Sequence, residues 1–246
     1  MNEQMLQNVA DIISNSRYCI AFTGAGVSVE SGIPPFRGEN SIWNNYDPGI
    51  LDLSNFKAHP EESWPVIKEI FYDFFGEAKP NKAHDFLAQL EDKGILKCVI
   101  TQNIDNLHQE AGSKCVFEFH GNSHNMVCTS CGDKKTVQEV DLSKLPLKCE
   151  KCGGLVKPDF IFFGEQIPEL AYQNSIDAAR DADVCLVIGS TGEVMPAALI
   201  PREAKRNGAK IIEINPQESL FTRDITDIHL KGKAGDICGN LARLVL

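Results

Sequence analysis

The sequence predicts an α/β fold: a doubly wound, mostly parallel, Rossmann-like sheet with a small zinc-ribbon and helical module inserted into it. Short, unbroken apolar runs rich in β-branched residues recur along the chain, as expected of strands buried on both faces. Segments with helical periodicity alternate with these runs, which is typical of doubly wound sheets. Two pairs of closely spaced cysteines predict the inserted ribbon.

The predicted elements follow one another along the chain. Strands are expected at 18–23, 96–101, 116–120, 184–189 and 210–215. Helices are expected at 4–15, 82–93, 104–111, 169–181, 196–207 and 236–246. Segments 31–56 and 126–158 break this rhythm, and we interpret them as a mobile loop that leads into a helical insertion, and a metal-stapled insertion. The resulting division assigns 1–38, 80–124 and 157–246 to the Rossmann-like domain, 39–79 to the helical insertion and 125–156 to the zinc ribbon. The two insertions are expected to pack together beside the sheet.

Composition and charge exclude several classes of protein. The 246 residues are 43% hydrophobic and 24% charged, which suits a protein with one substantial core. The net charge of −10 gives no broad attraction to phosphate backbones, so a basic peptide is a better partner than a nucleic acid. The apolar runs are only as long as strands, and the amino terminus does not resemble a secretory signal. Nine cysteines then indicate a reducing compartment, so we expect a cytoplasmic protein without a membrane span.

The four cysteines of the ribbon have the spacing of a zinc site. Cys128 and Cys131 form one C-x2-C pair, and after seventeen residues Cys149 and Cys152 form the second. Four thiolates leave no open coordination position, so we predict one structural Zn²⁺. Core cysteines or a redox pair are the alternatives. The other five cysteines are expected to pack as small apolar groups: Cys19, Cys98, Cys115, Cys185 and Cys238.

Glycines and polar residues follow three of the expected strands and predict a dinucleotide site. The first strand leads into 24–28 (GAGVS), where glycines would let backbone N–H groups approach a diphosphate, although Val29 stands where a third fingerprint glycine would fall. Residues 189–192 (GSTG) and Asn215 follow two later strands, at the edge where open α/β sheets bind ligands. The glycine pair could also be an ordinary turn, Ser190 a helix cap, and Asn215 a turn residue.

Six motifs together resemble the sirtuin family in order and spacing. They are GAGVSVESGIPPFRG at 24–38, TQNIDNLHQEAG at 101–112, FHG at 119–121, the four cysteines, KPDFIFFGE at 157–165 and GSTGEVMPAA at 189–198. The resemblance implies an NAD-dependent protein-lysine deacetylase that consumes NAD as a co-substrate and acts on acetylated proteins or peptides. The acyl-lysine carbonyl oxygen would displace nicotinamide, and the acyl group would pass to the ribose. The products would be free lysine, nicotinamide and O-acetyl-ADP-ribose.

The resemblance also assigns catalytic roles. His120 matches the general base, and imidazole suits that task because its pKa lies near neutral pH. An isolated histidine at a strand end is otherwise more often structural, and His124 is the obvious decoy. Asn103 is placed on the ribose side, and Asp105 with the Ile104 backbone at the nicotinamide carboxamide. Asn103 or Asp105 could equally cap the following helix. The remaining histidines are expected to be structural or surface groups: His59, His84, His108 and His229.

The same resemblance predicts which residues contact the co-substrate and the peptide. Phe36 and Arg37 would cover the reactive ribose from a loop that orders around ligand, although an ordinary surface loop is the simpler alternative. The cofactor-binding set is Gly24, Ala25, Gly26, Ser28, Val29, Phe36, Arg37, Gln102, Asn103, Ile104, Asp105, His120, Gly189, Ser190, Thr191, Asn215 and Ala234. The peptide would add as a strand between 162–166 and 192–194, with Phe160 and Ile161 along the lysine tunnel. The substrate-binding set is Ile161, Phe163, Gly164, Glu165, Gly192, Glu193 and Val194.

Two departures from the family pattern bear on substrate choice. Members that prefer succinyl or malonyl groups carry a Tyr-x-x-Arg pair, whereas this chain has Tyr72 and Phe75, so acetyl or another neutral acyl group is expected. The 189–198 stretch also departs from the usual form, which bears on subclass and peptide preference. Three other functions remain as alternatives: a mono-ADP-ribosyltransferase that uses the same NAD site, a zinc-ribbon nucleic-acid module and an ordinary NAD dehydrogenase.

Overall fold

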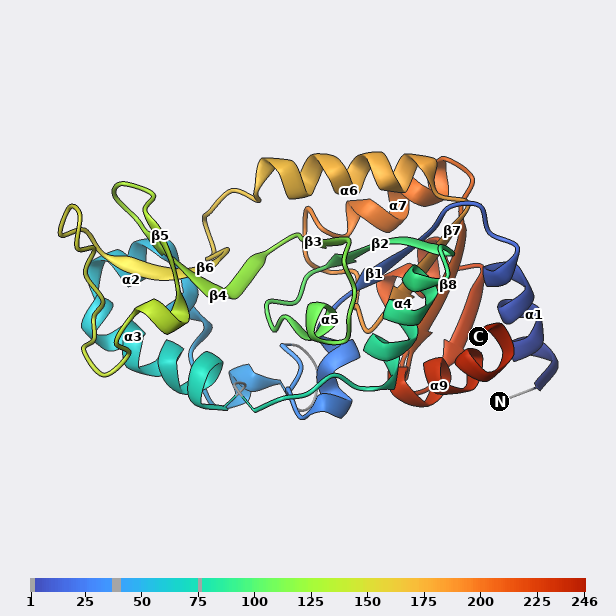
Figure 1. Cartoon of the computed structure of the whole chain (residues 1–246), viewed down its shortest axis with the longest axis horizontal. Coiled ribbons are helices and arrows are strands. Elements are labelled where there is room, and N and C mark those ends of the chain that lie inside the picture. Colours follow the sequence, from blue (N-terminus) through green and yellow to red (C-terminus); the bar gives the residue numbers. More distant parts are fainter. Residues whose placement is uncertain (1–2, 37–40, 75–76) are drawn as a thin grey trace.

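The computed structural model describes residues 3–36, 41–74 and 77–246. Two lobes are apparent in Figure 1. The larger lobe holds the main sheet between layers of helices, and the smaller lobe holds a short second sheet beside helices α2 and α3. Among the described residues, no helix combines the length and apolarity needed to cross a membrane.

The main sheet has six parallel strands in the order β3-β2-β1-β7-β8-β9. Their bounds are β1 Cys19–Thr23, β2 Leu96–Thr101, β3 Val116–Glu118, β7 Val184–Ile188, β8 Lys210–Asn215 and β9 Ile228–Lys231. This order is that of a Rossmann-like fold and confirms the predicted fold class. The strand order reverses between β1 and β7, which makes the carboxyl ends of these two strands the expected ligand edge. The sequence did not predict β9, a strand of only four residues.

Helices cover both faces of the sheet. One apolar core joins the strands to α1 (Glu3–Ser14), α4 (Lys82–Asp92) and α9 (Ala234–Val245), and a second joins them to α6 (Glu169–Asp181) and α7 (Leu199–Arg206). Two short helices, α5 (Leu107–Glu110) and α8 (Leu220–Asp224), complete this lobe. Helix α5 starts later than predicted because Asn106 has a positive φ of 63°, which is outside the helical region.

The small lobe is built from both insertions. An antiparallel sheet joins β4 (Gly121–Cys128) to β5 (Lys134–Thr136) and β6 (Val156–Phe160). The helical insertion contributes α2 (Leu53–Ala58), α3 (Pro60–Lys68) and the π-helix η4 (Glu69–Phe74). Short 3-10 helices are η1 (Ala25–Ser31), η2 (Ile42–Asn44), η3 (Pro48–Leu51) and η5 (Val137–Glu139).

One apolar core ties the two insertions together. Trp64 and Phe56 of the helical insertion are fully buried against Met126 and Val156 of the ribbon. The Trp64 indole Nε1 donates a hydrogen bond to the Val156 carbonyl at 3.0 Å, so the ring's polar edge is satisfied inside this core. The insertions therefore pack on each other, as the sequence analysis expected.

Candidate active site

The ends of β1 and β7 meet in a very close backbone contact. Gly26 N–H donates to the Gly189 carbonyl at 2.9 Å, and a Cβ on Gly26 would lie 2.6 Å from the Gly189 Cα. Gly189 has a φ of 65°, and a Cβ there would lie 2.3 Å from Val27 N. Both positions therefore require glycine. The chain then enters η1, so the two strand ends and the first turn of η1 form one compact edge.

Replacing Gly189 with alanine is expected to lower the free energy of unfolding by at least about 2 kcal/mol, because the positive φ and the backbone clash act together. Urea unfolding followed by circular dichroism measures the change. Gly208 is the matched control, since its φ is 96° but a Cβ there would meet nothing within 4 Å. Gly208→Ala should cost only about 1 kcal/mol, and equal losses in the two variants would contradict this interpretation of the contact.

Three polar side chains converge beside this edge. Ser28 Oγ donates to Asp105 Oδ2 at 2.6 Å and accepts from Asn103 Nδ2 at 3.0 Å, and Asn103 Nδ2 also reaches Asp105 Oδ2 at 3.2 Å. Burial raises the pKa of the Asp105 carboxyl, although its hydrogen bonds oppose that shift. Asp105 Oδ1 also accepts from Leu107 N at 3.1 Å, at the start of α5, but the N-cap residue of that helix is Asn106, whose side chain makes no capping bond.

Two buried histidines lie beneath this cluster. Asn81 N–H donates to His84 Nδ1 at 3.2 Å, so His84 Nε2 carries the proton and faces Ser28 Oγ at 3.4 Å. Burial lowers the pKa of His84 to about 4, so the ring is neutral. The ring of fully buried His108 lies 4.8 Å from it, centroid to centroid. The sequence analysis grouped both as structural or surface groups and missed the contact of His84 with Ser28. The Asn81 capping box, which includes His84, was the available signal.

His120 lies at the end of β3, where the chain turns into β4. Its Nδ1 donates to the Gln102 carbonyl at 3.1 Å, so Nε2 is the basic nitrogen of the neutral ring. Among the described residues, Nε2 makes no hydrogen bond. Burial lowers the pKa of His120 below its ordinary value, against an opposing effect of the Gln102 carbonyl. The Gln102 side chain bridges to Ser190 Oγ at 2.8 Å, which joins the ends of β2 and β7.

The outer part of the predicted site lies along β8 and α9. Asn215 is buried, and its Nδ2 donates to the Ser190 carbonyl at 3.0 Å and to Glu213 Oε1 at 2.8 Å. Ser190 caps no described helix, because α7 begins only at Leu199. The structure places the remaining predicted residues around this edge, with Ala234 buried at the start of α9 and with Val29 and Thr191 exposed.

Phe36 closes one side of a small pocket. The pocket is lined by Ala25, Ile33, Phe36, Asn103, Ile104 and Asp105. The Phe36 ring packs on Trp43 with centroids 5.7 Å apart and stacks on Phe71 at 6.5 Å. These contacts tie the pocket wall to the helical insertion, which distinguishes Phe36 from a residue of an ordinary surface loop. Arg37 lies outside the described residues.

Tyr72 links the π-helix to the same pocket. Its hydroxyl donates to the Ser123 carbonyl at 3.0 Å, and Ser123 Oγ donates to the Ile104 carbonyl at 2.7 Å. Burial raises the pKa of the Tyr72 phenol well above its usual range, so the hydroxyl keeps its proton. The Tyr72 hydroxyl therefore uses its proton in the hydrogen bond to the Ser123 carbonyl. Phe75, the other half of the expected acyl-selecting pair, lies outside the described residues.

The predicted peptide segment lies against the helical insertion on one edge. Phe163 N–H donates to the Leu51 carbonyl at 2.8 Å, and Leu53 N–H donates to the Phe163 carbonyl at 3.1 Å. Within the described chain, neither Gly164 nor Gly192 makes a backbone hydrogen bond. An extended peptide therefore has backbone groups available to it on both predicted segments. The Phe163 side chain is 57% exposed beside them.

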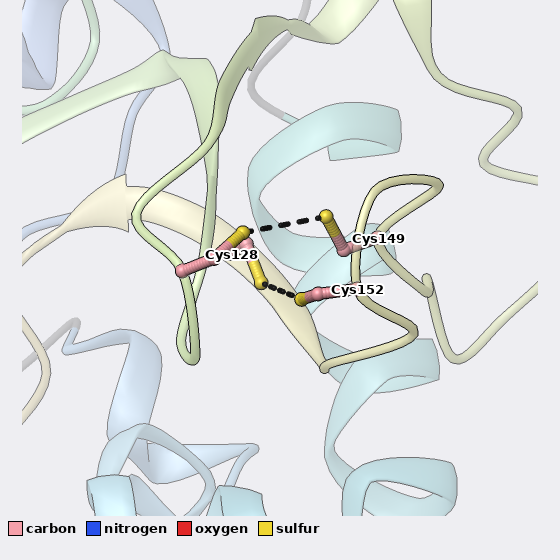
Figure 2. Close-up of side chains that lie close together, drawn as sticks. Cys128, Cys149 and Cys152 are labelled. Atoms are coloured by element: carbon pink, nitrogen blue, oxygen red, sulfur yellow. Dashed lines mark hydrogen bonds between the residues drawn. The ribbon is translucent and has the colours of Figure 1, made fainter.

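The four ribbon cysteines form a compact cluster. All four Sγ atoms lie within 4.8 Å of one another, and Figure 2 shows the sulfur atoms of the two knuckles facing each other. The Sγ separations are 3.5 Å for Cys128 and Cys152 and 3.7 Å for Cys131 and Cys149. A tetrahedral zinc with Zn–S bonds near 2.3 Å requires about 3.8 Å between sulfurs, so the cluster fits the ion.

Backbone amides point at two of the four sulfur atoms. Ser130 N–H points at Cys128 Sγ and Gly154 N–H points at Cys152 Sγ, each at 3.4 Å. Amide donors lower the pKa of Cys128 to about 6, whereas the Gly154 amide is outweighed at Cys152, where the neighbouring thiols raise the pKa to about 12. The remaining cysteines lie apart from this cluster: Cys19, Cys98, Cys185 and Cys238 are buried, and Cys115 is half-buried. Packing as small apolar groups is thus confirmed for the four buried ones.

Comparison with known proteins decides the family. The Sir2 family model matches residues 24–196, which span the glycine edge, the polar cluster, His120 and all four ribbon cysteines. The chain belongs to the Sir2 family. The resemblance to sirtuins stated from the sequence is thereby confirmed.

Relatives of this Sir2-family chain match over nearly its whole length. The NAD-dependent protein deacylase of Pyrococcus furiosus is 45% identical over 96% of each chain. The NAD-dependent protein deacetylase of Thermotoga maritima is 42% identical over 88% of this chain and 89% of its own. A solved complex described as Sir2, p53 peptide and NAD⁺ is 38% identical, has a TM-score of 0.89 and is covered over 97% of each chain.

Proposed function

We propose that this Sir2-family chain is an NAD-dependent protein-lysine deacylase that removes acetyl groups from lysine side chains. The observation that carries the proposal is the placement of His120. Its basic nitrogen lies at the same sheet edge as the Ser28, Asn103 and Asp105 cluster, where Rossmann-like folds bind dinucleotides. One compact site can therefore hold the sugar of a dinucleotide next to a general base.

The roles proposed for the residues follow from their positions. We assign the backbone N–H of Ala25, at the start of η1, to the diphosphate, and buried Asn215 and Ala234 to the adenosine end. Asn103 would contact the nicotinamide ribose, and Asp105 the carboxamide. Asp105 would accept a hydrogen bond from the carboxamide N–H through its carboxylate oxygens.

The tautomer of His120 suits a general base. The Gln102 carbonyl fixes the proton on Nδ1, which leaves Nε2 to accept a proton from a ribose hydroxyl. In the proposed reaction the acyl-lysine carbonyl oxygen displaces nicotinamide from the ribose. The deprotonated hydroxyl would then attack the acyl carbon, the C–N bond to lysine would break, and one water would complete the ester, so that the products are nicotinamide, free lysine and O-acetyl-ADP-ribose. Phe36 would shield the reactive ribose carbon from premature attack by water.

We assign the zinc a structural role. Four thiolates complete its coordination, so the ion has no position for substrate, and it would hold the two knuckles of the small lobe together. We also propose the division into a Rossmann-like domain (1–38, 80–124, 157–246), a helical insertion (39–79) and a ribbon (125–156). A cytoplasmic location is proposed as well, since a zinc thiolate cluster and five further free cysteines suit a reducing compartment.

The direct test incubates the purified protein with an acetyl-lysine peptide, with and without NAD, and identifies the products by mass spectrometry. The expected result is deacetylated peptide, nicotinamide and O-acetyl-ADP-ribose in equal amounts, and only with NAD. Deacetylation at the same rate without NAD would contradict the proposal. A peptide that gains ADP-ribose and keeps its acetyl group would favour mono-ADP-ribosyl transfer instead.

Acyl preference gives a second test. A succinyl peptide is expected to react at least about tenfold more slowly than a matched acetyl peptide, because a buried carboxylate without a cationic partner is costly. Tyr72 is committed to the Ser123 carbonyl and offers no charge. Competition between the two peptides, followed by chromatography, measures the ratio of kcat/KM. A butyryl peptide is the neutral control, and faster removal of succinyl than of either neutral group would contradict the expectation.

A further inference from the structure

Lys157 is a buried cation with no role in the reaction described above. Its side chain is only 4% exposed. Its Nζ donates to the Pro158 carbonyl at 2.9 Å and the Phe160 carbonyl at 2.7 Å, and it lies 2.9 Å from Glu165 Oε2. The Phe162 ring lies 4.5 Å from the same nitrogen. Burial is costly for an ammonium group and lowers the pKa of Lys157, so its position requires compensating contacts.

Every one of these contacts lies on one short stretch, residues 158–165, which contains the predicted peptide edge. Glu165 completes the arrangement from the other end, because its Oε2 also accepts from Phe162 N at 2.7 Å. The Glu165 backbone N–H donates to the Phe162 carbonyl at 3.0 Å, which closes the turn. The Glu165 carboxylate therefore faces inward, so this side chain is bonded to the protein at the position where peptide contact was predicted.

Residues 158–165 contact both His120 and the helical insertion. Its Ile161 N–H donates to the His120 carbonyl at 2.9 Å, and its Phe163 peptide group pairs with Leu51 and Leu53 of the helical insertion. Among the described residues, the backbone groups of Gly164, at the tip of the turn, make no hydrogen bond. The buried ion pair of Lys157 and Glu165 therefore holds the 160–165 turn, which is the predicted peptide edge.

We propose that Lys157 and Glu165 act together as positioning residues that hold the 160–165 turn in the shape required for backbone pairing with the acyl-lysine peptide. This inference rests on the proposed function and concerns peptide affinity specifically. A strand added through main-chain hydrogen bonds is sensitive to the exact path of the receiving chain. Loss of the pair should therefore weaken peptide binding. The affinity for NAD should change little, because the described contacts of Lys157 Nζ and of the Glu165 carboxylate lie within residues 157–165.

The experiment compares Lys157→Met, Glu165→Gln and the double variant with the wild-type enzyme. Peptide affinity is measured by fluorescence anisotropy with a labelled acetyl-lysine peptide, and KM for NAD and kcat are measured separately. Each single variant is expected to bind peptide about tenfold more weakly. KM for NAD should change less than about twofold. The double variant should lose no more than the worse single variant, since the two side chains act as a unit.

The matched control is Lys134→Met, which removes an ion pair with Asp159 on the same strand. That pair is more exposed, with Lys134 61% accessible, and makes no bond to the 160–165 turn. The peptide affinity of the Lys134→Met variant should stay within about twofold of wild type. Zinc content and thermal unfolding establish that each variant is folded, and Glu165→Gln carries the test should Lys157→Met fail to fold.

Three results would overturn the inference. The first is folded variants that bind peptide as wild type does, and the second is a fall in kcat with peptide affinity unchanged, which would point to His120 instead. The third is a rise in KM for NAD as large as the loss of peptide affinity, which would indicate a general structural effect. Failure of the proposed function looks different, because the wild-type protein itself would then neither bind nor deacetylate the peptide.

Discussion

Deacetylation by a His120→Ala variant is expected to be about a thousandfold slower than wild type, within the range of 10²–10⁴ that general bases contribute. The substitution removes the nitrogen proposed to accept the ribose proton and leaves the polar cluster at Ser28 intact. The fold should survive, because His120 is only partly buried and its ring makes one hydrogen bond among the described residues. Chromatographic assay of O-acetyl-ADP-ribose under saturating NAD and peptide measures the loss.

His124→Ala is the matched control for this prediction. His124 lies on the neighbouring strand β4 and is also half-buried, but the site described above makes no use of its ring. Its turnover should remain within about threefold of wild type. Comparable losses in both variants would show that the effect is structural, and near-normal turnover in His120→Ala would remove the base assignment.

The pH profile provides an independent check on the same residue. Burial lowers the pKa of His120 below its ordinary value near 6.5, so the neutral, basic form persists into more acidic solution. Activity that requires this form is lost as pH falls through the folded-state pKa. The acid limb of kcat/KM should therefore have its midpoint below pH 6.5. A midpoint at or above this value would contradict the burial argument.

A Cys149→Ala variant is expected to lose both its zinc and its activity. Structural zinc sites contribute about 10–16 kcal/mol of binding free energy that is coupled to folding. The ribbon and the helical insertion share one core, which includes Cys149 itself, so loss of the ion should loosen the whole small lobe. That lobe carries Phe71, against which Phe36 stacks, and Leu51, which pairs with Phe163. The pocket and the edge proposed to bind NAD and peptide would both be affected.

Metal analysis by mass spectrometry and deacetylation assays check this prediction. Cys238→Ala is the control, because Cys238 is a fully buried thiol in the core of the large lobe, far from the metal cluster in both sequence and fold. That variant should keep one zinc per chain and its activity. Full activity of Cys149→Ala without zinc would show that the ribbon is dispensable for catalysis.

Local patterns in the sequence predicted the large lobe well. Five of the six parallel strands, and the glycines at their ends, follow from apolar runs and turn residues that lie within a few positions of one another. The zinc cluster follows in the same way, since each knuckle is a short motif. The strand β9 was missed because IHLK is too short and too polar to stand out.

The buried polar contacts were beyond the reach of local patterns. His84 meets Ser28 from a different helix, and Tyr72 of the helical insertion meets the carbonyl of Ser123 on β4. Lys157 has its partners nearby in sequence, but nothing in KPDFIFFGE indicates that the ammonium is buried. A lysine or a tyrosine is ordinarily placed at the surface by composition rules, and only the folded chain shows which ones are enclosed.

The pairing of β1 with β7 also constrains how this protein is assembled during synthesis. Cys19 lies beside Val184 in the centre of the sheet, so at translation rates of 5–20 residues per second the first strand waits on the order of ten seconds for its partner. The apolar core of the small lobe ends at Phe162 and is complete earlier on the ribosome. Zinc is therefore expected to bind the nascent chain before β7 has been synthesised and has paired with β1.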